Sequence, residues 1–145
     1  RITALLEDRL LAVVPVDHRL ASLPRFPIKE VENEPFISLL ETSDHDARRA
    51  LEAAGVKPNI RYTTKDDYAI IAMVEQGLGV SIMPELLLSG RSDNVRIMEL
   101  TPPASRTIGL CLPDADRAGP ATLRFADCVS DWVREHYSRL QNTLS

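Results

Sequence analysis

The sequence predicts an α/β fold in which a mainly parallel sheet is covered by helices on both faces. Short apolar runs, typical of buried strands, alternate along the chain with segments of helical periodicity. The stretch from 67 to 85 shows one repeat of this pattern. An apolar run of helix length leads into Gly77-Leu78-Gly79, a short apolar strand follows at 80–83, and Pro84-Glu85 favours the first turn of another helix.

Six segments are predicted strands because they are short and apolar, or alternate between apolar and polar residues. They lie at 10–15, 35–39, 58–63, 80–83, 95–100 and 107–112. Proline should end several of them, since it has no N–H to donate to a ladder. In particular, Pro102-Pro103 is expected to separate the last two strands.

Five segments are predicted helices, at 27–34, 44–54, 67–76, 84–90 and 120–140. The first should be only one or two turns long, with Ile28 and Val31 on its inner face. Thr42-Ser43-Asp44 offers side chains suited to capping the second helix, and Thr64-Lys65-Asp66-Asp67 repeats that signature before the third.

The last predicted helix carries an unusually wide apolar face, which includes Phe125, Val129, Trp132 and Val133. Left uncovered, such a face would form a large exposed apolar patch. We therefore expect it to bury against a second copy of the chain or against a repositioned surface of the same chain.

Length and composition indicate one globular domain with a core: 145 residues, 44% hydrophobic and 26% charged. The net charge of -4 provides no overall basic field for nucleic acid, so any DNA-contacting part should lie elsewhere. Cys111 and Cys128 are expected to be core thiols in a reducing compartment. No membrane span or signal peptide is visible, and the opening Arg1 suggests a fragment of a longer cytoplasmic protein.

Three motifs resemble catalytic, metal or cofactor sites, but each lacks a feature that such a site requires. Gly77-x-Gly79 follows a helix and lacks the third glycine of a dinucleotide loop. Ser81 lacks the second glycine of a nucleophile elbow. Asp44-His45-Asp46 are adjacent on a helix start and point in different directions, so they cannot converge on one ion. We expect no catalytic residues, no metal and no cofactor.

The best candidates for ligand binding are the two helix starts at 38–44 and 63–66. Each follows the C-terminal end of a predicted strand, where open α/β sheets bind ligands. Hydroxyls and backbone N–H groups there can hold a carboxylate or another anion, and Lys65 is the nearby cation. The alternative is that Thr42, Ser43 and Thr64 only cap their own helices. Neighbouring aspartates argue against a highly charged anion.

Four stretches resemble the effector-binding domain of the LysR-type transcriptional regulators. They are L-L-A-V-V-P-V-D-H-R-L-A (10–21), E-P-F-I-S-L (34–39), G-L-G-V-S-I-M-P-E (77–85) and R-T-I-G-L-C-L-P (106–113). Their order and spacing carry the resemblance, which covers roughly residues 5–140. It implies a Rossmann-like three-layer lobe of the type 2 periplasmic-binding-protein-like fold, with a C-terminal helix that belongs to a mostly missing first lobe.

The resemblance also implies a domain plan and a function. Residues 1–14 would be a crossover from the first lobe, 15–112 the second lobe, and 113–145 the return segment and last helix. A small, anionic metabolite would bind between the lobes and control DNA binding by a separate N-terminal winged helix-turn-helix. Self-association as a dimer or tetramer is expected. The implied effector-binding residues are Ser38, Thr42, Ser43, Thr64, Lys65 and Asp66.

Two other function classes stay open at this point. A periplasmic-type solute-binding protein shares the two-lobed plan, and an upstream signal peptide would favour it. A small α/β enzyme would need a converging acid, base or nucleophile set, and the sequence offers none that we can identify.

Overall fold

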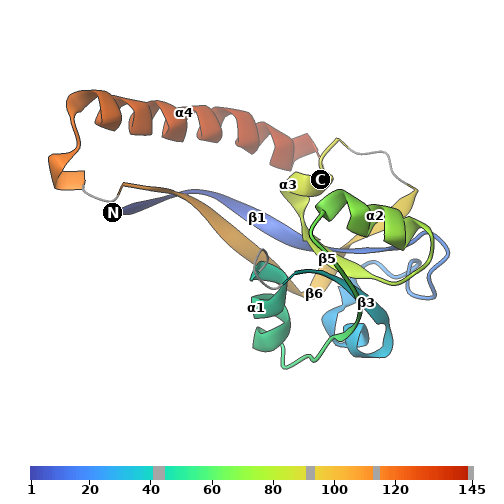
Figure 1. The fold of residues 1–145 in the computed structure, drawn as a ribbon. Helices are drawn as coiled ribbons and strands as arrows, with labels where there is room; N and C mark the ends of the chain where they lie inside the picture. Colours follow the sequence, from blue (N-terminus) through green and yellow to red (C-terminus); the bar gives the residue numbers. More distant parts are fainter. Residues whose placement is uncertain (41–44, 91–93, 113–114, 144–145) are drawn as a thin grey trace. The chain divides into compact units, whose positions relative to one another are not determined.

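A computed structural model describes residues 1–40, 45–90, 94–112 and 115–143, so the predicted residues Thr42, Ser43 and Asp44 lie outside the described part. The α/β fold class is confirmed. The elements are β1 (Ile2–Pro15), β2 (Phe26–Pro27), the 3-10 helix η1 (Ile28–Asn33), β3 (Pro35–Leu39), α1 (Asp46–Ala53), β4 (Asn59–Thr64), α2 (Asp67–Glu75), β5 (Ser81–Pro84), α3 (Glu85–Leu88), β6 (Val95–Cys111), the 3-10 helix η2 (Ala115–Arg117) and α4 (Pro120–Thr143) (Figure 1).

The chain divides into two compact units. The larger runs from Arg9 to Arg106, and the smaller combines Arg1–Asp8 with Thr107–Ser145. Both β1 and β6 therefore pass from one unit into the other. Within the described residues, no helix is long and apolar enough to cross a membrane.

The sheet of the larger unit is built from two hydrogen-bonded parts. Four strands follow the order β2-β6-β1-β5, and β3 pairs with β4. A parallel bridge between Phe36 and Val80 joins the two parts. The Ile37 N–H donates to the Val80 carbonyl and the Val80 N–H to the Pro35 carbonyl, both at 2.9 Å. Because Val80 directly precedes β5, this bridge places β3 alongside β5.

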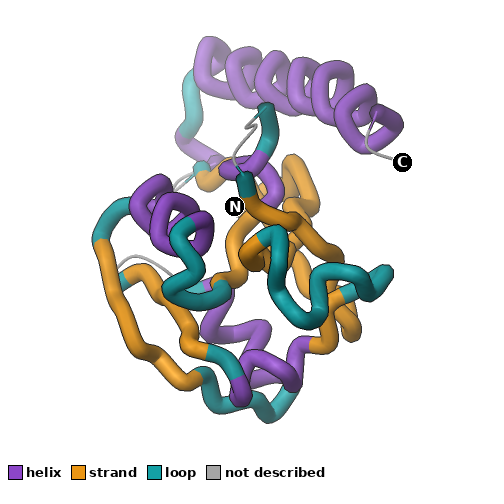
Figure 2. Tube along the Cα trace, turned by 90° about the vertical axis from the view of Figure 1, so that its right-hand side faces the viewer, coloured by secondary structure: helices purple, strands orange, loops and turns teal. Residues whose placement is uncertain are grey.

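Two apolar clusters cover the two faces of this sheet. In β1 the side chains alternate: Leu10, Ala12 and Val14 join one cluster, while Leu11 and Val13 join the other. The first cluster is completed by η1 and α1, the second by α2 and α3. Figure 2 draws the helices in purple and the strands in orange. This double burial is why 10–14 is an unbroken apolar run. Ile28 and Val31 face inward from η1, as the sequence predicts.

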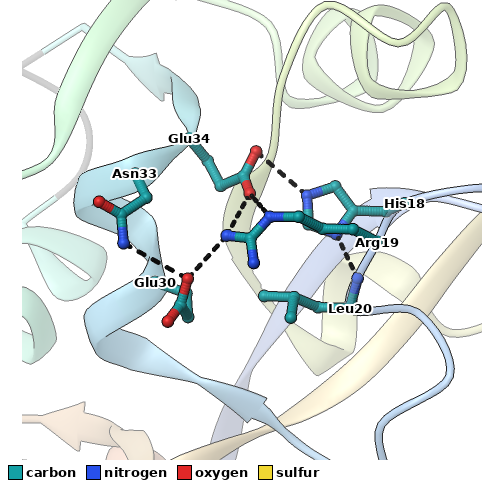
Figure 3. A network of polar contacts seen from close by, with 6 residues as sticks. All are labelled: His18, Arg19, Leu20, Glu30, Asn33 and Glu34. Atoms are coloured by element: carbon teal, nitrogen blue, oxygen red, sulfur yellow. Dashed lines mark hydrogen bonds and ion pairs between the residues drawn. The ribbon is translucent and has the colours of Figure 1, made fainter.

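A network of ion pairs fixes the segment between β1 and β3 (Figure 3). Arg19 donates through Nε to Glu34 at 2.9 Å and through Nη2 to Glu30 at 2.7 Å. These hydrogen bonds raise the pKa of Arg19 and lower that of Glu30. The His18 Nδ1 accepts the Leu20 N–H at 3.1 Å. The buried His18 Nε2 lies 3.1 Å from Glu34 Oε2 without forming a hydrogen bond of good geometry.

In the smaller unit, the ends of β1 and β6 lie side by side. The Arg1 amino group donates to the Leu112 carbonyl and the Leu112 N–H to the Arg1 carbonyl, each at 2.9 Å. Further along, the Thr107 hydroxyl donates to Glu7. The close contact of Gly109 with Thr3 leaves little room for a side chain at position 109.

Helix α4 exposes aromatic side chains that the sequence predicts to be covered. Phe125 is 65% exposed and Trp132 52% exposed, and both lie in the smaller unit. The Trp132 ring instead stacks on His136 at 4.2 Å between ring centroids. Burial of this face against a second copy of the chain, or against another surface of the same chain, stays a prediction.

Two further expectations about the elements are corrected. The sheet is mixed rather than mainly parallel, because β1 pairs antiparallel with β5. The helices α1 and α2 connect β3, β4 and β5 in sequence, and such helical crossovers join parallel strands. The two predicted strands around Pro102-Pro103 form one strand, β6. Since β2 pairs with β6 only up to Thr101, a proline beyond that point can face an open side of the ladder without losing a hydrogen bond.

The expectation that both cysteines are core thiols is also wrong. Cys111 and Cys128 are free and exposed. Cys111 ends β6 in the smaller unit and Cys128 lies on α4, whereas the two apolar clusters are built from residues of the larger unit. Apolar neighbours in the sequence therefore did not translate into burial at these positions.

Gly79→Ala should destabilise the larger unit. A Cβ at position 79 would collide with the Pro35 carbonyl, meeting its carbon atom at 3.0 Å, and this backbone is held by the bridge to Val80. We expect a loss of about 1–3 kcal/mol in the free energy of unfolding, measured by urea denaturation. Gly119→Ala is the control, because nothing lies within 4 Å of its added Cβ. Equal stability of the two variants would contradict this account.

Acid should weaken an ion pair between β1 and α3. Arg9 donates two hydrogen bonds to Glu85, both at 2.8 Å, and they lower the pKa of Glu85 despite partial desolvation. A carboxyl with a lowered folded-state pKa stabilises above its unfolded pKa and loses that contribution as the pH falls through its folded value. Between pH 7 and pH 3, wild type should therefore lose up to about 1 kcal/mol more than Glu85→Gln in urea unfolding. The control Glu75→Gln should behave as wild type, and identical acid sensitivity of Glu85→Gln would refute the pair's role.

Candidate functional site

A cavity of about 110 Å³ lies where β3 and β5 end and where α1 and α2 begin. Most of its lining residues are apolar. Five polar side chains also line it: Ser38, Asp46, Asp67, Ser81 and Arg106. All of them belong to the larger unit. A concave site with a few convergent polar groups at the carboxyl ends of parallel strands is the usual position for a ligand in such folds.

The parallel pairing of β3 with β4 brings the two predicted helix starts to one edge of the sheet. Ser38 pairs with Thr63 and Leu39 with Thr64. Beyond the paired residues, the Leu40 N–H still donates to the Thr64 carbonyl at 3.0 Å. The chain therefore leaves both strands from adjacent positions.

Of the predicted binding residues, Ser38 lines the cavity, whereas Thr64, Lys65 and Asp66 are not among the residues that line it. The Ser38 hydroxyl donates to the neighbouring Leu39 carbonyl at 2.9 Å. Thr42 and Ser43 lie outside the described residues.

Thr64 and Asp66 act as caps at the start of α2. The Thr64 hydroxyl accepts the Asp66 N–H at 3.2 Å, and the Asp66 carboxylate accepts the Tyr68 N–H at 2.9 Å. Lys65, between them, is exposed. This is the capping role that the sequence left open as an alternative. Ligand contact by these three residues stays a prediction.

Sequence reasoning did not select four of the polar residues at the cavity. The most informative is Arg106, whose Nη1 lies 3.3 Å from Asp46 Oδ2. Both side chains are partly buried, with 27% of Arg106 and 31% of Asp46 exposed. The two residues are 60 positions apart, so only the fold brings them together. Asp46 was considered only as part of a metal motif, and Asp67 only as a helix start.

Ser81 has a structural hydrogen bond at the back of the cavity. Its buried hydroxyl donates to the Ile37 carbonyl at 2.7 Å, which adds a link between β5 and β3 beside the bridge at Val80. The hydroxyl is therefore oriented towards backbone rather than towards a general base. Among the described residues, no group of three His, Cys, Asp or Glu side chains could hold a metal ion.

The polar lining can recognise a ligand by charge and by hydrogen bonds. Among the described lining residues, Arg106 is the one cation, and Asp46 and Asp67 carry negative charge. A guanidinium suits a carboxylate, and the two aspartates suit hydroxyl or amine donors on the same molecule. A ligand with several negative charges would face repulsion from both aspartates.

Comparison with known families decides which kind of protein carries this site. The family model for the LysR substrate binding domain matches residues 1–134. The chain belongs to this LysR family. The resemblance that the sequence motifs suggested is thereby confirmed, including the partial extent of the chain.

The curated relatives of this LysR domain are transcriptional regulators. It is 28% identical over 133 residues to the uncharacterized HTH-type transcriptional regulator YybE of Bacillus subtilis, covering 90% of this chain and 44% of that protein. It is 31% identical over 102 residues to YwbI, also of Bacillus subtilis, covering 68% of this chain and 34% of that protein. The chain thus spans less than half the length of these relatives.

Solved LysR regulatory domains share its fold. The Synechocystis PCC6803 CcmR regulatory domain in complex with 2-PG superposes with a TM-score of 0.75 at 17% identity, covering 94% of this chain and 68% of that one. The effector-binding domain of QuiR in complex with shikimate also gives 0.75, at 23% identity, covering 93% and 66%. These matches confirm the type 2 periplasmic-binding-protein-like fold.

Removing the Ser81 hydroxyl should destabilise the larger unit. Ser81→Ala leaves the buried Ile37 carbonyl without this 2.7 Å hydrogen bond, so we expect a loss of about 1–2 kcal/mol in urea unfolding. Ser89→Ala is the matched control, because the Ser89 hydroxyl is exposed and bonds its own helix at 3.3 Å. Equal effects of the two substitutions would show that Ser81 does not link β3 and β5.

Proposed function

We propose that this chain is the ligand-sensing part of a LysR-type transcriptional regulator, and that its effector is a small metabolite with one carboxylate. The effector binds at the cavity between β3 and β5, and its binding controls DNA binding and transcription by a separate N-terminal winged helix-turn-helix. The observation that carries the proposal is that Arg106, Ser38, Asp46 and Asp67 line one cavity at the ends of β3 and β5, with Arg106 paired to Asp46.

The charges of the site support a monoanion. The effector carboxylate would share the Arg106 guanidinium with Asp46. A guanidinium has enough N–H donors to bind both carboxylates at once. A phosphate or dicarboxylate would add a second charge near Asp46 and Asp67. Shikimate, bound by the structural neighbour QuiR, is a small carboxylate of this kind.

The predicted contact residues form two groups in this proposal. Ser38 on β3, and Thr42 and Ser43 between β3 and α1 in the sequence, contact the effector directly. Thr64, Lys65 and Asp66 form the adjacent rim at the start of α2, where Lys65 adds positive charge. Their caps and the 3.0 Å hydrogen bond from Leu40 to Thr64 hold this rim beside Ser38.

The proposal also includes the predicted domain plan. Residues 15–112 form the second lobe, while 1–14 and 113–145 connect it to a first lobe. The effector shifts the population of open and closed lobes, which requires unequal affinity for the two states. The regulator works in the cytoplasm as a homodimer or homotetramer.

A regulator is favoured over an enzyme or a solute-binding protein. The curated relatives that match this chain are transcriptional regulators, including the dual regulator GltC of Bacillus subtilis. The hydroxyl of Ser81, a candidate nucleophile by residue type, donates to a backbone carbonyl instead of a base.

Monocarboxylates should raise the melting temperature of the chain. Ligand at 100 times its Kd stabilises the folded state by about 2.7 kcal/mol, which raises Tm by about 4 °C or more in a domain of this size. The test is thermal denaturation with shikimate, benzoate and glycolate, compared with malonate and phosphoglycolate. At least one monocarboxylate should raise Tm more than the two multiply charged acids.

The control for this measurement separates Arg106 from general charge effects. Arg106→Gln should weaken binding and reduce the shift, whereas Arg96→Gln, an exposed arginine on β6, should keep it. The proposal fails if no monocarboxylate raises Tm, or if the shift in Arg106→Gln equals that of wild type.

A further inference from the structure

We infer that the groove between α1 and β4 holds an apolar arm of the effector, so that the effector is an amphipathic acid with an aliphatic or aromatic group. This inference rests on the proposed function in one respect, the position of the carboxylate at the polar cavity. The apolar groove itself is a separate feature of the larger unit.

The groove has the size and lining of a ligand site. Its volume is about 410 Å³, within the range of about 300–1,000 Å³ that small-molecule pockets occupy. Phe36, Leu51 and Val56 form apolar walls and are 2%, 2% and 5% exposed. Ile60 from β4 also lines the groove, although 48% of it is exposed. Ile60 is an apolar side chain half exposed to water at the edge of an apolar cavity. Covering such a side chain with a ligand removes apolar surface from water, which favours binding.

The groove adjoins the polar cavity. Phe36, Ser38, Leu39 and Ala47 line both. Along β3, Phe36 and Ser38 project to the same face because strand side chains alternate. A molecule whose carboxylate lies at the Ser38 end can therefore extend its apolar part past Ser38 and over Phe36.

An irregularity in the strand pairing directs Ile60 into the groove. Phe36 pairs with Ile60 but Ile37 pairs with Tyr62, so Arg61 is an extra residue on β4. Paired residues of neighbouring strands share a face of the sheet. Ile60 therefore lies on the α1 side with Phe36, while Tyr62 lies on the α2 side with Ile37.

The charges at the rim of the groove are balanced, so the preference for an acid comes from the adjoining polar cavity. Arg48, Lys57 and Glu52 line the groove, and the Nε of Arg48 is 3.7 Å from Glu52. The Lys57 N–H donates to the Glu32 carboxylate at 3.0 Å, which brings a second negative charge beside Lys57. In the polar cavity, the Arg106 guanidinium can donate hydrogen bonds to a carboxylate but not to an ammonium group.

The test is the affinity of the wild-type chain for butanoate, hexanoate and octanoate, measured by calorimetry. If the groove buries the alkyl chain, each added methylene should lower Kd by about fourfold. Ile60→Glu should flatten this dependence by placing a carboxylate at the apolar wall. Tyr62→Glu is the matched control, because Tyr62 is 39% exposed on the other face of the same strand, and it should keep the wild-type slope.

A second variant distinguishes the groove from the carboxylate site. Arg106→Gln should weaken all three acids by a common factor and leave the slope unchanged, because it alters the polar cavity only. The inference is overturned if Kd does not depend on chain length, if Ile60→Glu keeps the slope, or if octylammonium binds as well as octanoate. If octanoate does not bind while an acid from the thermal panel does, the inference fails and the proposed function stands.

Discussion

The structure of the larger unit depends on a short parallel contact between Val80 and β3. Two backbone hydrogen bonds of 2.9 Å form it, and the buried Ser81 hydroxyl adds a third link of 2.7 Å to the Ile37 carbonyl. Gly79 permits the approach, because a side chain there would collide with the Pro35 carbonyl. Without this contact the four strands β2-β6-β1-β5 and the pair β3-β4 would be separate sheets.

The candidate site follows from this contact. It fixes the ends of β3 and β5 side by side, so that the first turns of α1 and α2 face one cavity from opposite faces of the sheet. Arg106, near the end of β6 in this unit, then lies within 3.3 Å of Asp46. The same β3 residues, Phe36 and Ser38, form a wall of the apolar groove beside α1. One strand thus contributes to the walls of both the polar cavity and the apolar groove, and we propose that both receive parts of the same effector.

The features of the fold that depend on local sequence patterns could be predicted from the sequence. The glycine turn before Val80, the caps of α2 and the unbroken apolar run of β1 are local, and the elements they indicate are present. The Arg106–Asp46 pair could not be predicted, because it joins residues 60 positions apart through the sheet. The continuity of β6 through Pro102-Pro103 also depends on the tertiary context, namely on how far β2 extends along it. Cys128 was misjudged because its apolar neighbours on α4 do not belong to either of the two apolar clusters, which the sequence of the helix alone does not reveal.

Hydrogen exchange of the Ile37 and Val80 amides tests the central contact most directly. Both amides donate across the join between the two parts of the sheet. If this join holds the unit together, they should exchange only through global unfolding, at the same free energy as the buried amide of Val13 in β1. Exchange of Ile37 and Val80 through a local opening of much lower free energy, with Val13 still protected, would contradict the account.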